Sequence, residues 1–415
     1  MSTIKVDHEA VKAASASFPK PSDFTPTYGT AGFRAEASLL DSTLFRCGLL
    51  AAARSLLMQR ACGLMITASH NPARDNGVKL VEPGGEMLPQ EWEPLATRLA
   101  QAASDAEVAD CIAAILRDAS ADPAHAAQGA TTCGAGPLVI VGYDTRDSAA
   151  RLLKAAQAGI EALGVACDVA GLVTTPQLHW VVHAHNRLPN HPPAAACLPL
   201  YLDTLLGAFE QLVQELPPSQ TPQVALQLMH VDCANGVGAT LLASASERLA
   251  KSGLTLVLYN TGDGQLNHGC GADFVQKERV APNGGMHALA PGARCASIDG
   301  DADRAVIFTP STPSTPSTNP TPASLPSAAP TPIALMDGDK IAALAATLVR
   351  DLLEQLPGSF SLSPATSAPP HVGVVQTAYA NGASTAYITG SLRLPVECTP
   401  TGVKYLHHAA QVRRS

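Results

Sequence analysis

Three aspartates in one short segment have the residue type and spacing of a metal site. The segment DGDADR, residues 299–304, follows a short apolar run at 295–298. Asp299, Asp301 and Asp303 occupy alternate positions, so their side chains are predicted to converge on one side of an extended loop. Carboxylate oxygens are the hard ligands that Mg²⁺ and Ca²⁺ require. A solvated acidic turn is the alternative, but the repulsion between three crowded carboxylates favours a bound cation.

The details of this segment favour magnesium. An EF-hand loop beginning at Asp299 would need glycine at its sixth position and glutamate at its twelfth, where this chain has Arg304 and Pro310. A haloacid-dehalogenase-type phosphatase usually has threonine or valine where this chain has Asp303. Few protein ligands leave room for water and a phosphate oxygen at about 2.1 Å, which suits Mg²⁺. The planar guanidinium of Arg304 suits that phosphate.

A serine and a histidine follow a strand-like run at 63–66, in the segment ITASHNP. Pro72 prevents simple continuation of that strand, and the turn signal Asn-Gly follows at 76–77. Ser69 and His70 are therefore predicted to lie in a loop at a strand end, where α/β sheets usually bind ligands. Neighbouring Ser and His residues are common in polar loops, so this pair gains meaning only from its surroundings.

Two cationic side chains could join such a site. The loop YGTAGFR, residues 28–34, could bring backbone N–H groups to an anion and ends in the guanidinium of Arg34. Lys79, in the segment DNGVK, adds an amine after the serine. A serine that could carry phosphate, a carboxylate loop, arginines and a lysine together form a set suited to phosphoryl transfer.

Three other segments have more ordinary interpretations. The segment DTR at 144–146, with Ser148 after it, is typical of an ion pair and a helix cap, and DGD at 337–339 is also typical of a cap. The histidine, cysteine and aspartate within 268–273 are loosely spaced like zinc ligands. Because their loop is rich in glycine, zinc is disfavoured there.

The segments that carry the candidate functional residues lie among predicted strands that alternate with predicted helices. This alternation predicts an α/β fold of consecutive modules with mostly parallel, mixed sheets. The tripeptide Ala-Asn-Gly follows a predicted strand at 234–236 and again at 380–382. This recurrence reflects either duplicated α/β modules or chance. Three strand-helix units are predicted: strands 137–144 and 165–175 around a helix at 148–164; strands 225–233 and 254–259 around a helix with Leu241, Leu242, Ala245 and Leu249; and a helix with Ile341, Leu344, Leu348 and Leu352 followed by a strand at 372–377.

Three segments, at 186–199, 309–332 and 356–370, are expected to resist folding. The middle one is rich in Pro, Ser and Thr and has no apolar periodicity, so it cannot bury enough surface to offset its ordering entropy. It is most simply a linker. The predicted organisation is a first domain at 1–188 with the serine, a second at 189–308 with the acidic segment near its end, the insertion at 309–332 and a partial third domain at 333–415.

Composition excludes several classes of partner. The formal net charge of −8 gives no long-range attraction for polyanions, so neither nucleic acid nor an acidic membrane surface is an expected partner. No run approaches the ~18 apolar residues of a membrane-spanning helix, and residues 1–20 lack an apolar signal region, so a cytoplasmic protein is expected. Ten cysteines without a CxxC pair are predicted to be reduced.

Taken in order, the motifs resemble those of the α-D-phosphohexomutase superfamily. YGTAGFR, TASHNP, DNGVK, VGYDTR, TTPQL and DGDADR occur here in that superfamily's order. Within the superfamily, MITASHNPARDNGVKLVEPGGEML, VDCANGVGA and TGVKYLHHAA are more similar to phosphoacetylglucosamine mutases than to phosphoglucomutases or phosphomannomutases. The resemblance covers nearly all of the chain outside the low-complexity segments.

The resemblance implies an isomerase that works by intramolecular phosphoryl transfer. It would interconvert N-acetylglucosamine 6-phosphate and 1-phosphate, on the route to UDP-N-acetylglucosamine, through a phosphoserine and a bisphosphate intermediate. It would use one Mg²⁺ per chain and a sugar 1,6-bisphosphate primer, and its partner would be a phosphosugar. The oligomeric state stays open. The implied roles are phosphoserine for Ser69; metal ligation for Ser69, Asp299, Asp301 and Asp303; phosphate contacts for Arg34, His70 and Arg304; acid/base or electrostatic assistance for Lys79; and substrate binding for Lys404.

The end of the chain leads to a further expectation. Members of this family have four domains, and this sequence ends at Ser415, within what corresponds to the third. A sugar-recognising loop and a fourth domain that binds the non-reacting phosphate would then be missing. Because remote phosphate binding orients the reacting end, little or no mutase activity is expected from this chain alone. The alternatives are a non-catalytic protein that keeps the phosphorylatable serine and Mg²⁺ loop, and a sugar phosphatase in which water attacks phospho-Ser69.

Overall fold

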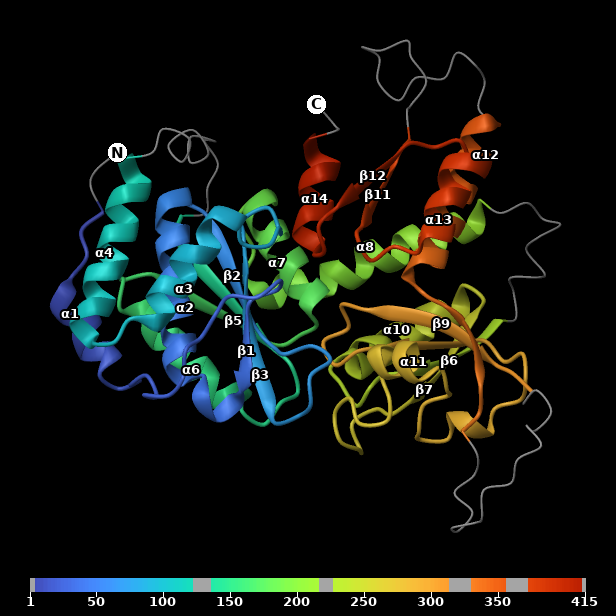
Figure 1. Ribbon diagram of the computed structural model, residues 1–415, viewed down its shortest axis with the longest axis horizontal. Coiled ribbons are helices and arrows are strands. Elements are labelled where there is room, and N and C mark those ends of the chain that lie inside the picture. Colours follow the sequence, from blue (N-terminus) through green and yellow to red (C-terminus); the bar gives the residue numbers. More distant parts are fainter. Residues whose placement is uncertain (1–3, 122–135, 216–226, 313–329, 356–371, 413–415) are drawn as a thin grey trace. The chain divides into compact units, whose positions relative to one another are not determined.

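The computed structural model describes residues 4–121, 136–215, 227–312, 330–355 and 372–412 (Figure 1). The chain divides into two compact units, Met1–Ala334 and Leu335–Ser415. The first unit contains two five-stranded sheets, and the division falls inside an edge strand of the second sheet. Helices alternate with mixed parallel and antiparallel strands, so the predicted α/β class is confirmed. The four predicted domain segments stay predictions.

The first sheet has the strand order β1-β3-β2-β4-β5. Strand β2 pairs antiparallel with β3 and parallel with β4, and β4 pairs parallel with β5. The helix between β4 and β5 completes the first predicted β-α-β unit. The elements are β1 (Phe33–Glu36), β2 (Ala61–Ile66), β3 (Asp75–Val81), β4 (Leu138–Tyr143), α6 (Ala149–Glu161) and β5 (Ala166–Leu172).

Helices cover both faces of this sheet. Leu64 and Ile66 of β2 pack into the same apolar cluster as helices α2 and α6, whereas Met65 packs with α7, since successive residues of a strand point to opposite faces. Helices α2 and α6 approach each other so closely that a Cβ at Gly48 would lie 2.1 Å from a carbonyl oxygen of α6. Only glycine leaves room for this approach. The surrounding helices are α1 (His8–Ser15), α2 (Asp41–Met58), α3 (Glu93–Gln101), α4 (Asp105–Ala121), α7 (Thr175–Arg187) and α8 (Ala194–Gln214), with 3-10 turns at Ala37–Leu39 and Gln90–Trp92.

The second sheet has the order β10-β9-β8-β6-β7. Strand β6 runs parallel to β7 and β8, and β8 forms an antiparallel hairpin with β9. Strands β6 and β7 with α10 between them form the second predicted unit. The elements are β6 (Gln227–Asp232), α10 (Gly238–Lys251), β7 (Leu254–Tyr259), α11 (Ala272–Glu278), a 3-10 turn at Met286–Ala288, β8 (Cys295–Ile298), β9 (Ala305–Pro310) and β10 (Ile333–Met336).

The second unit contains a parallel strand pair. Strand β11 pairs with β12, and the predicted third helix and the strand after it are both present. As predicted, Asp337 caps that helix by accepting a hydrogen bond from the Lys340 backbone N–H. The elements are α12 (Gly338–Glu354), β11 (Val374–Thr377), α13 (Gly382–Ala386), a π-helical turn at Tyr387–Ser391, β12 (Val396–Thr399) and α14 (Val403–Val412).

In α12, Leu344 and Leu348 are each 59% exposed, and Ala346 belongs to the apolar cluster of this unit. One expectation about folded segments is wrong. The segment 186–199 does fold, since α8 begins at Ala194 and runs through Pro199. Its first turn is fixed by apolar packing and by the Ala194 N–H, which donates to the carboxylate of Asp168 at 2.8 Å. The predicted segment at 356–370 lies outside the described residues.

Among the described ranges, no helix combines the length and the apolar composition that membrane crossing requires. The described cysteines are all free, as the missing CxxC spacing predicts.

Candidate active site

The serine loop, residues 67–74, connects β2 to β3. Ser69 lies in this loop with a φ of +56° and is fully buried. A left-handed conformation costs a residue with a Cβ on the order of 1–3 kcal/mol, so neighbouring contacts must hold it. Thr67 provides one, because its Oγ1 accepts from the Ser69 N–H at 2.9 Å and donates to Asp144 at 2.7 Å. The predicted loop position of Ser69 and His70 is confirmed.

The Asn-Gly turn expected at 76–77 is wrong. Both residues belong to β3, where Asn76 lies opposite Ala35 and Gly77 lies opposite Arg34. A Cβ at Gly77 would lie 2.4 Å from the carbonyl oxygen of Phe33. The glycine therefore serves close approach between strands rather than a turn.

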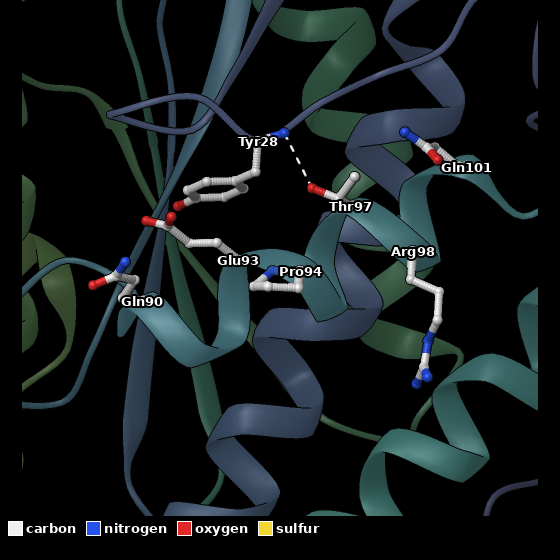
Figure 2. Close-up of a pocket in the computed structure, with 7 residues that line it drawn as sticks. All are labelled: Tyr28, Gln90, Glu93, Pro94, Thr97, Arg98 and Gln101. Carbon is white, nitrogen blue, oxygen red and sulfur yellow. Dashed lines mark hydrogen bonds between the residues drawn. The ribbon is translucent and has the colours of Figure 1, made fainter.

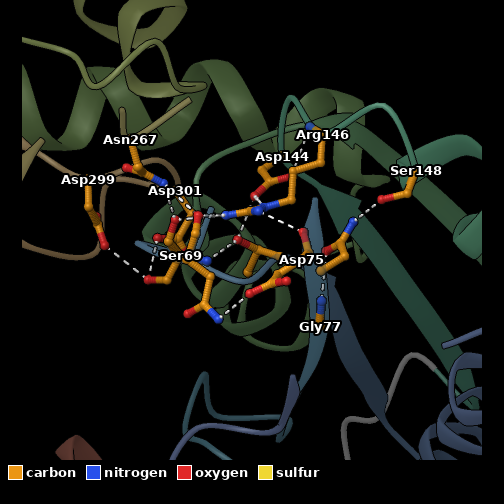
Figure 3. Close-up of polar contacts among 12 residues, drawn as sticks. Ser69, Asp75, Gly77, Asp144, Arg146, Ser148, Asn267, Asp299 and Asp301 are labelled. Carbon is orange, nitrogen blue, oxygen red and sulfur yellow. Dashed lines mark hydrogen bonds and ion pairs between the residues drawn. The ribbon is translucent and has the colours of Figure 1, made fainter. Parts of the chain in front are cut away.

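The acidic turn, residues 299–304, connects β8 to β9 and faces the serine loop (Figure 3). The Ser69 Oγ lies 3.0 Å from Asp299, 2.8 Å from Asp301 and 3.2 Å from a carboxylate oxygen of Asp303. The carboxylates converge, with oxygens within 4.8 Å of one another. The expected extended loop is wrong, however: the segment is a tight turn in which Ala302 has a φ of +57°. Chain reversal, rather than alternation along a strand, brings the carboxylates together.

Lys79 of β3 reaches the same carboxylates from the other side. Its Nζ lies 2.8 Å from Asp301 and 2.6 Å from Asp303. Thr175, the first residue of α7, donates its hydroxyl to Asp301 at 2.6 Å, and its backbone N–H donates to the Asp301 carbonyl. Both sheets of the first unit therefore contribute to one polar cluster.

Burial and charge act differently on the three ionisable groups at the centre of this cluster. Burial and the neighbouring carboxylates raise the pKa of Asp299 to about 8. For Asp301, burial is outweighed by Lys79 and by donated hydrogen bonds, which lower its pKa to about 2. Burial also opposes the charge of Lys79, but Asp301 and Asp303 raise its pKa, so the amine stays protonated. The cluster keeps an excess of negative charge that a cation would offset.

The other predicted cationic residues surround this cluster. Burial lowers the pKa of Arg34, on β1, against the opposing effect of Asp301 and Asp303. Burial, together with the nearby Arg304 and Arg34, lowers the pKa of His70 to about 4, so its ring is neutral at pH 7. Arg304 is partly exposed and lies 3.5 Å from a carboxylate oxygen of Asp273. Arg34 and Arg304 thus add positive charge near the carboxylates, whereas His70 adds a neutral ring.

Sequence reasoning missed Thr175 and Asn267 in this region, and it assigned Arg146 only an ion pair. Arg146 is not directed at a phosphate; it forms a buried ion pair with Asp144 at 3.0 Å and donates to carbonyls of the serine loop. The predicted ion pair is therefore confirmed, but Ser148 makes no side-chain cap and instead accepts from Asn76. The motifs TTPQL and VGYDTR could have drawn attention to two of these residues, although a motif does not tell which buried acceptor a side chain reaches.

Two other segments named from the sequence have contacts of their own. Asp273 forms ion pairs with Lys277 and Arg304, and the Cys270 sulfur accepts a hydrogen bond from Asn235. Both groups therefore interact with protein side chains that are not zinc ligands. Lys404 lies on α14, in the second unit, above the ring of Tyr405.

The loop at 28–34 also borders a separate pocket (Figure 2). Tyr28 lies at its wall, and its backbone N–H donates to Thr97 at 3.2 Å. The remaining lining residues are Gln90, Glu93, Pro94, Arg98 and Gln101. None of them belongs to the cluster around Ser69.

Comparison with known proteins identifies the family. The phosphoacetylglucosamine mutase AMG1 domain III model matches residues 337–413, and the phosphoglucomutase/phosphomannomutase alpha/beta/alpha domain I model matches residues 48–106 and 121–195. The phosphoacetylglucosamine mutase of Mus musculus is 40% identical over 98% of this chain and 67% of its own length. The chain belongs to the phosphoacetylglucosamine mutase family. It is therefore a member of a family of isomerases that transfer phosphoryl groups.

Solved structures of phosphoacetylglucosamine mutases share this fold. An Aspergillus fumigatus N-acetylphosphoglucosamine mutase in complex with glucose 1,6-bisphosphate matches with a TM-score of 0.80 and 34% identity, over 99% of this chain and 68% of that one. The A. fumigatus enzyme in complex with GlcNAc-6P and magnesium matches with a TM-score of 0.77 and 36% identity, over 97% of this chain and 67% of that one. This chain spans about two thirds of the length of these relatives; its expected weak activity stays a prediction.

Proposed function

We propose that this chain transfers a phosphoryl group between Ser69 and phosphorylated N-acetylglucosamine, and so interconverts the 6-phosphate and the 1-phosphate. The observation that carries the proposal is the position of Ser69 Oγ, which is 3.2 Å or less from a carboxylate oxygen of each of three aspartates. A relative described in complex with GlcNAc-6P and magnesium supports the substrate and the metal. The 1-phosphate product would supply UDP-N-acetylglucosamine synthesis.

The acidic turn fits one Mg²⁺. The single hydroxyl proton of Ser69 serves one carboxylate, and Asp299, whose pKa is about 8, can donate its own proton to the Ser69 Oγ. At least one of the three contacts therefore lacks a donor in the absence of a cation. Asp299, Asp301 and Asp303 would hold the ion together with a phosphate oxygen on Ser69. When bound, Mg²⁺ neutralises charge on the phosphoryl group during transfer.

The chain's own residues would divide the remaining work. As the bond between phosphorus and Ser69 Oγ breaks, a bond forms to the sugar hydroxyl oxygen, and the proton that the sugar loses is balanced by the one that Ser69 regains. The second phosphate of the resulting bisphosphate returns to Ser69 by the reverse step, and a sugar 1,6-bisphosphate primes the cycle. Arg34, His70 and Arg304 would hold the transferring phosphate. Lys404 would bind the substrate.

The charge on Lys79 narrows its role. Two carboxylates lie within 2.8 Å of its Nζ and raise its pKa, which keeps the amine protonated. A protonated amine cannot accept the proton of a sugar hydroxyl, but it can stabilise negative charge as it develops on the oxygen. Lys79 is therefore proposed as an electrostatic partner rather than a general base.

The test compares the wild-type chain with Ser69→Ala. Each is given Mg²⁺ and glucose 1,6-bisphosphate, phosphorylation is measured by intact mass, and isomerisation of N-acetylglucosamine 6-phosphate is followed in parallel. The proposal predicts phosphorylation of the wild type alone, and isomerisation that requires Ser69. Equal phosphorylation of both proteins, or of neither, overturns it. Sustained release of inorganic phosphate without isomerisation would instead identify a phosphatase.

A further inference from the structure

The serine loop turns several carbonyl groups toward one buried guanidinium. Arg146 donates from Nη1 to the carbonyl oxygens of Pro72 at 2.6 Å and Asp75 at 2.7 Å. From Nη2 it donates to Ser69 at 3.1 Å and Asn71 at 3.0 Å. The Arg146 side chain is completely buried, and Figure 3 shows it beside the loop. One planar group therefore fixes the backbone from Ser69 to Asp75.

The side-chain amide of Asn267, which follows strand β7 of the second sheet, donates to two of the same carbonyls. Asn267 donates from Nδ2 to the carbonyl oxygen of Ser69 at 2.8 Å and to that of Asn71 at 3.2 Å. Asn267 is itself held with a φ of +57°, and its backbone N–H donates to Ala234 at 3.0 Å. The carbonyls of Ser69 and Asn71 are thus bound from two directions.

The acidic turn approaches the loop closely at the same point. A Cβ at Gly300 would lie 2.8 Å from the Ser69 carbonyl oxygen and 3.0 Å from the Asn267 Nδ2. Any side chain here would push apart the serine, the amide and the turn. The backbone of Ser69 is therefore enclosed by Arg146, Asn267 and Gly300, while its hydroxyl faces the carboxylates.

We propose that Arg146 and Asn267 are positioning residues that together hold the serine loop in the conformation needed for phosphoryl transfer. This inference rests on the proposed function of Ser69. A phosphorylated serine carries a charge of about −1.5 to −2 and, whenever no cation lies between them, would be repelled by the carboxylates next to it. Hydrogen bonds to the carbonyls on the opposite side of the loop resist that displacement. Because a misplacement of about 1 Å can cost about 10²-fold in rate, the restraint matters for catalysis.

The test uses Arg146→Lys and Asn267→Ala in the full chain. Lysine keeps the positive charge but lacks the fork that binds several carbonyls, and alanine removes the amide donor. Two readouts are taken: the rate of Ser69 phosphorylation by glucose 1,6-bisphosphate, and hydrogen exchange of the amides in residues 67–75. We expect each variant to slow phosphorylation by about 10²-fold and to speed up exchange in the loop.

Two matched controls separate positioning from stability. Arg54 forms a buried ion pair with Glu82, and the buried Asn186 donates to three carbonyls, including that of Ala61 at 2.8 Å. Ala61 begins β2, whereas the serine loop follows its other end. Arg54→Lys and Asn186→Ala should lower stability to a similar extent and leave both loop exchange and the phosphorylation rate within about threefold of the wild type, since the loop is not touched.

The outcomes separate this inference from the proposed function. Slow phosphorylation in Arg146→Lys and Asn267→Ala, but not in equally destabilised controls, supports positioning. Equal slowing in all four variants would mean that the slower phosphorylation reflects lost stability, and this result overturns the positioning role. If the wild type is not phosphorylated at all, the proposed function fails. Hydrogen exchange of the serine loop then tests the positioning role alone, and unchanged protection in both variants overturns that role. If Arg146→Lys does not fold, Asn267→Ala still decides the question by the same two readouts.

Discussion

Two buried acidic sites lie at the ends of the neighbouring strands β6 and β8, and their surroundings differ. Asp232, at the end of β6, accepts four hydrogen bonds from uncharged donors, two at each carboxylate oxygen. The donors are the Ser297 hydroxyl at 2.6 Å, the Gly271 N–H at 2.6 Å, the Asn260 amide at 2.7 Å and the Ala234 N–H at 3.1 Å. After β8, the three carboxylates of the acidic turn lie around the hydroxyl of Ser69. The amine of Lys79 contacts Asp301 and Asp303, Thr175 donates to Asp301, and two backbone N–H groups donate to Asp299.

This difference distinguishes a structural carboxylate from a functional one. The four donors at Asp232 join β6, β8 and the loops after β6 and β7, so this residue organises the strand ends. At the acidic turn, three carboxylates lie close together near one amine. Burial and the like charges of Asp301 and Asp303 therefore raise the pKa of Asp299 to about 8. A site with a charge excess is suited to a cation, whereas a site with complete hydrogen bonding is not.

Removing the amine of Lys79 from the acidic cluster is expected to have the largest effect. Lys79→Met leaves the buried carboxylate of Asp301 and the more exposed carboxylate of Asp303 without their counterion, so without Mg²⁺ the free energy of unfolding should fall by about 3–5 kcal/mol. Adding Mg²⁺ should recover part of this loss. Urea unfolding with and without Mg²⁺ measures both effects. Lys154→Met, at an exposed position, is the control and should stay within about 0.5 kcal/mol. A loss that Mg²⁺ leaves unchanged would contradict a metal site here.

The next largest effect is expected at Asp301. Asp301→Asn removes a charged oxygen that lies close to both Ser69 and Lys79, and so should weaken Mg²⁺ binding without unfolding the protein. Phosphorylation of Ser69 should slow by about 10²-fold, since a metal supplies several kcal/mol of charge stabilisation in the transition state. Calorimetry measures the affinity and intact mass measures the phosphorylation. Unchanged Mg²⁺ affinity would remove Asp301 from the site.

The smallest effect on chemistry is expected at Asp232. Asp232→Asn places an NH₂ group against buried N–H and O–H donors, so stability should fall by about 1–3 kcal/mol. Mg²⁺ affinity should match that of the wild type, because Asp232 is not part of the acidic turn. Thermal unfolding and calorimetry on the same preparation give both values. A large loss of Mg²⁺ affinity in a folded variant would show that the two acidic sites are not separate.

The sequence predicted the alternating part of the fold well. The units around α6 and α10 were identified from apolar runs and helical spacing, because their strands are apolar segments and each helix has one apolar face. Helix α12 was identified from leucines at helical spacing, yet Leu344 and Leu348 are exposed and Ala346 makes the contact with the apolar cluster. Periodicity identifies an apolar stripe, but it does not say which element packs against it.

The candidate site was predicted in part. Ser69, Lys79 and the three aspartates were named from their chemistry and from the resemblance, and the structure brings them together. Thr175 and Asn267 were missed, and the contacts of Arg146 with the serine loop were not foreseen, because all three residues donate to acceptors far away in sequence. The Ser69 carbonyl, for example, is 77 positions from Arg146 and 198 from Asn267.

The sequence by itself determined the inventory of reactive groups and the strand ends that carry them. Residue type fixes whether a side chain can carry phosphate, bind a metal or hold a charge, and local patterning fixes where a strand stops. Only the tertiary structure decided that the serine loop and the acidic turn meet, that Lys79 stays protonated between two carboxylates, and that Arg146 faces backbone carbonyls instead of a phosphate. These outcomes depend on distance, burial and the number of donors around each group, which arise when segments that are far apart in the chain pack together.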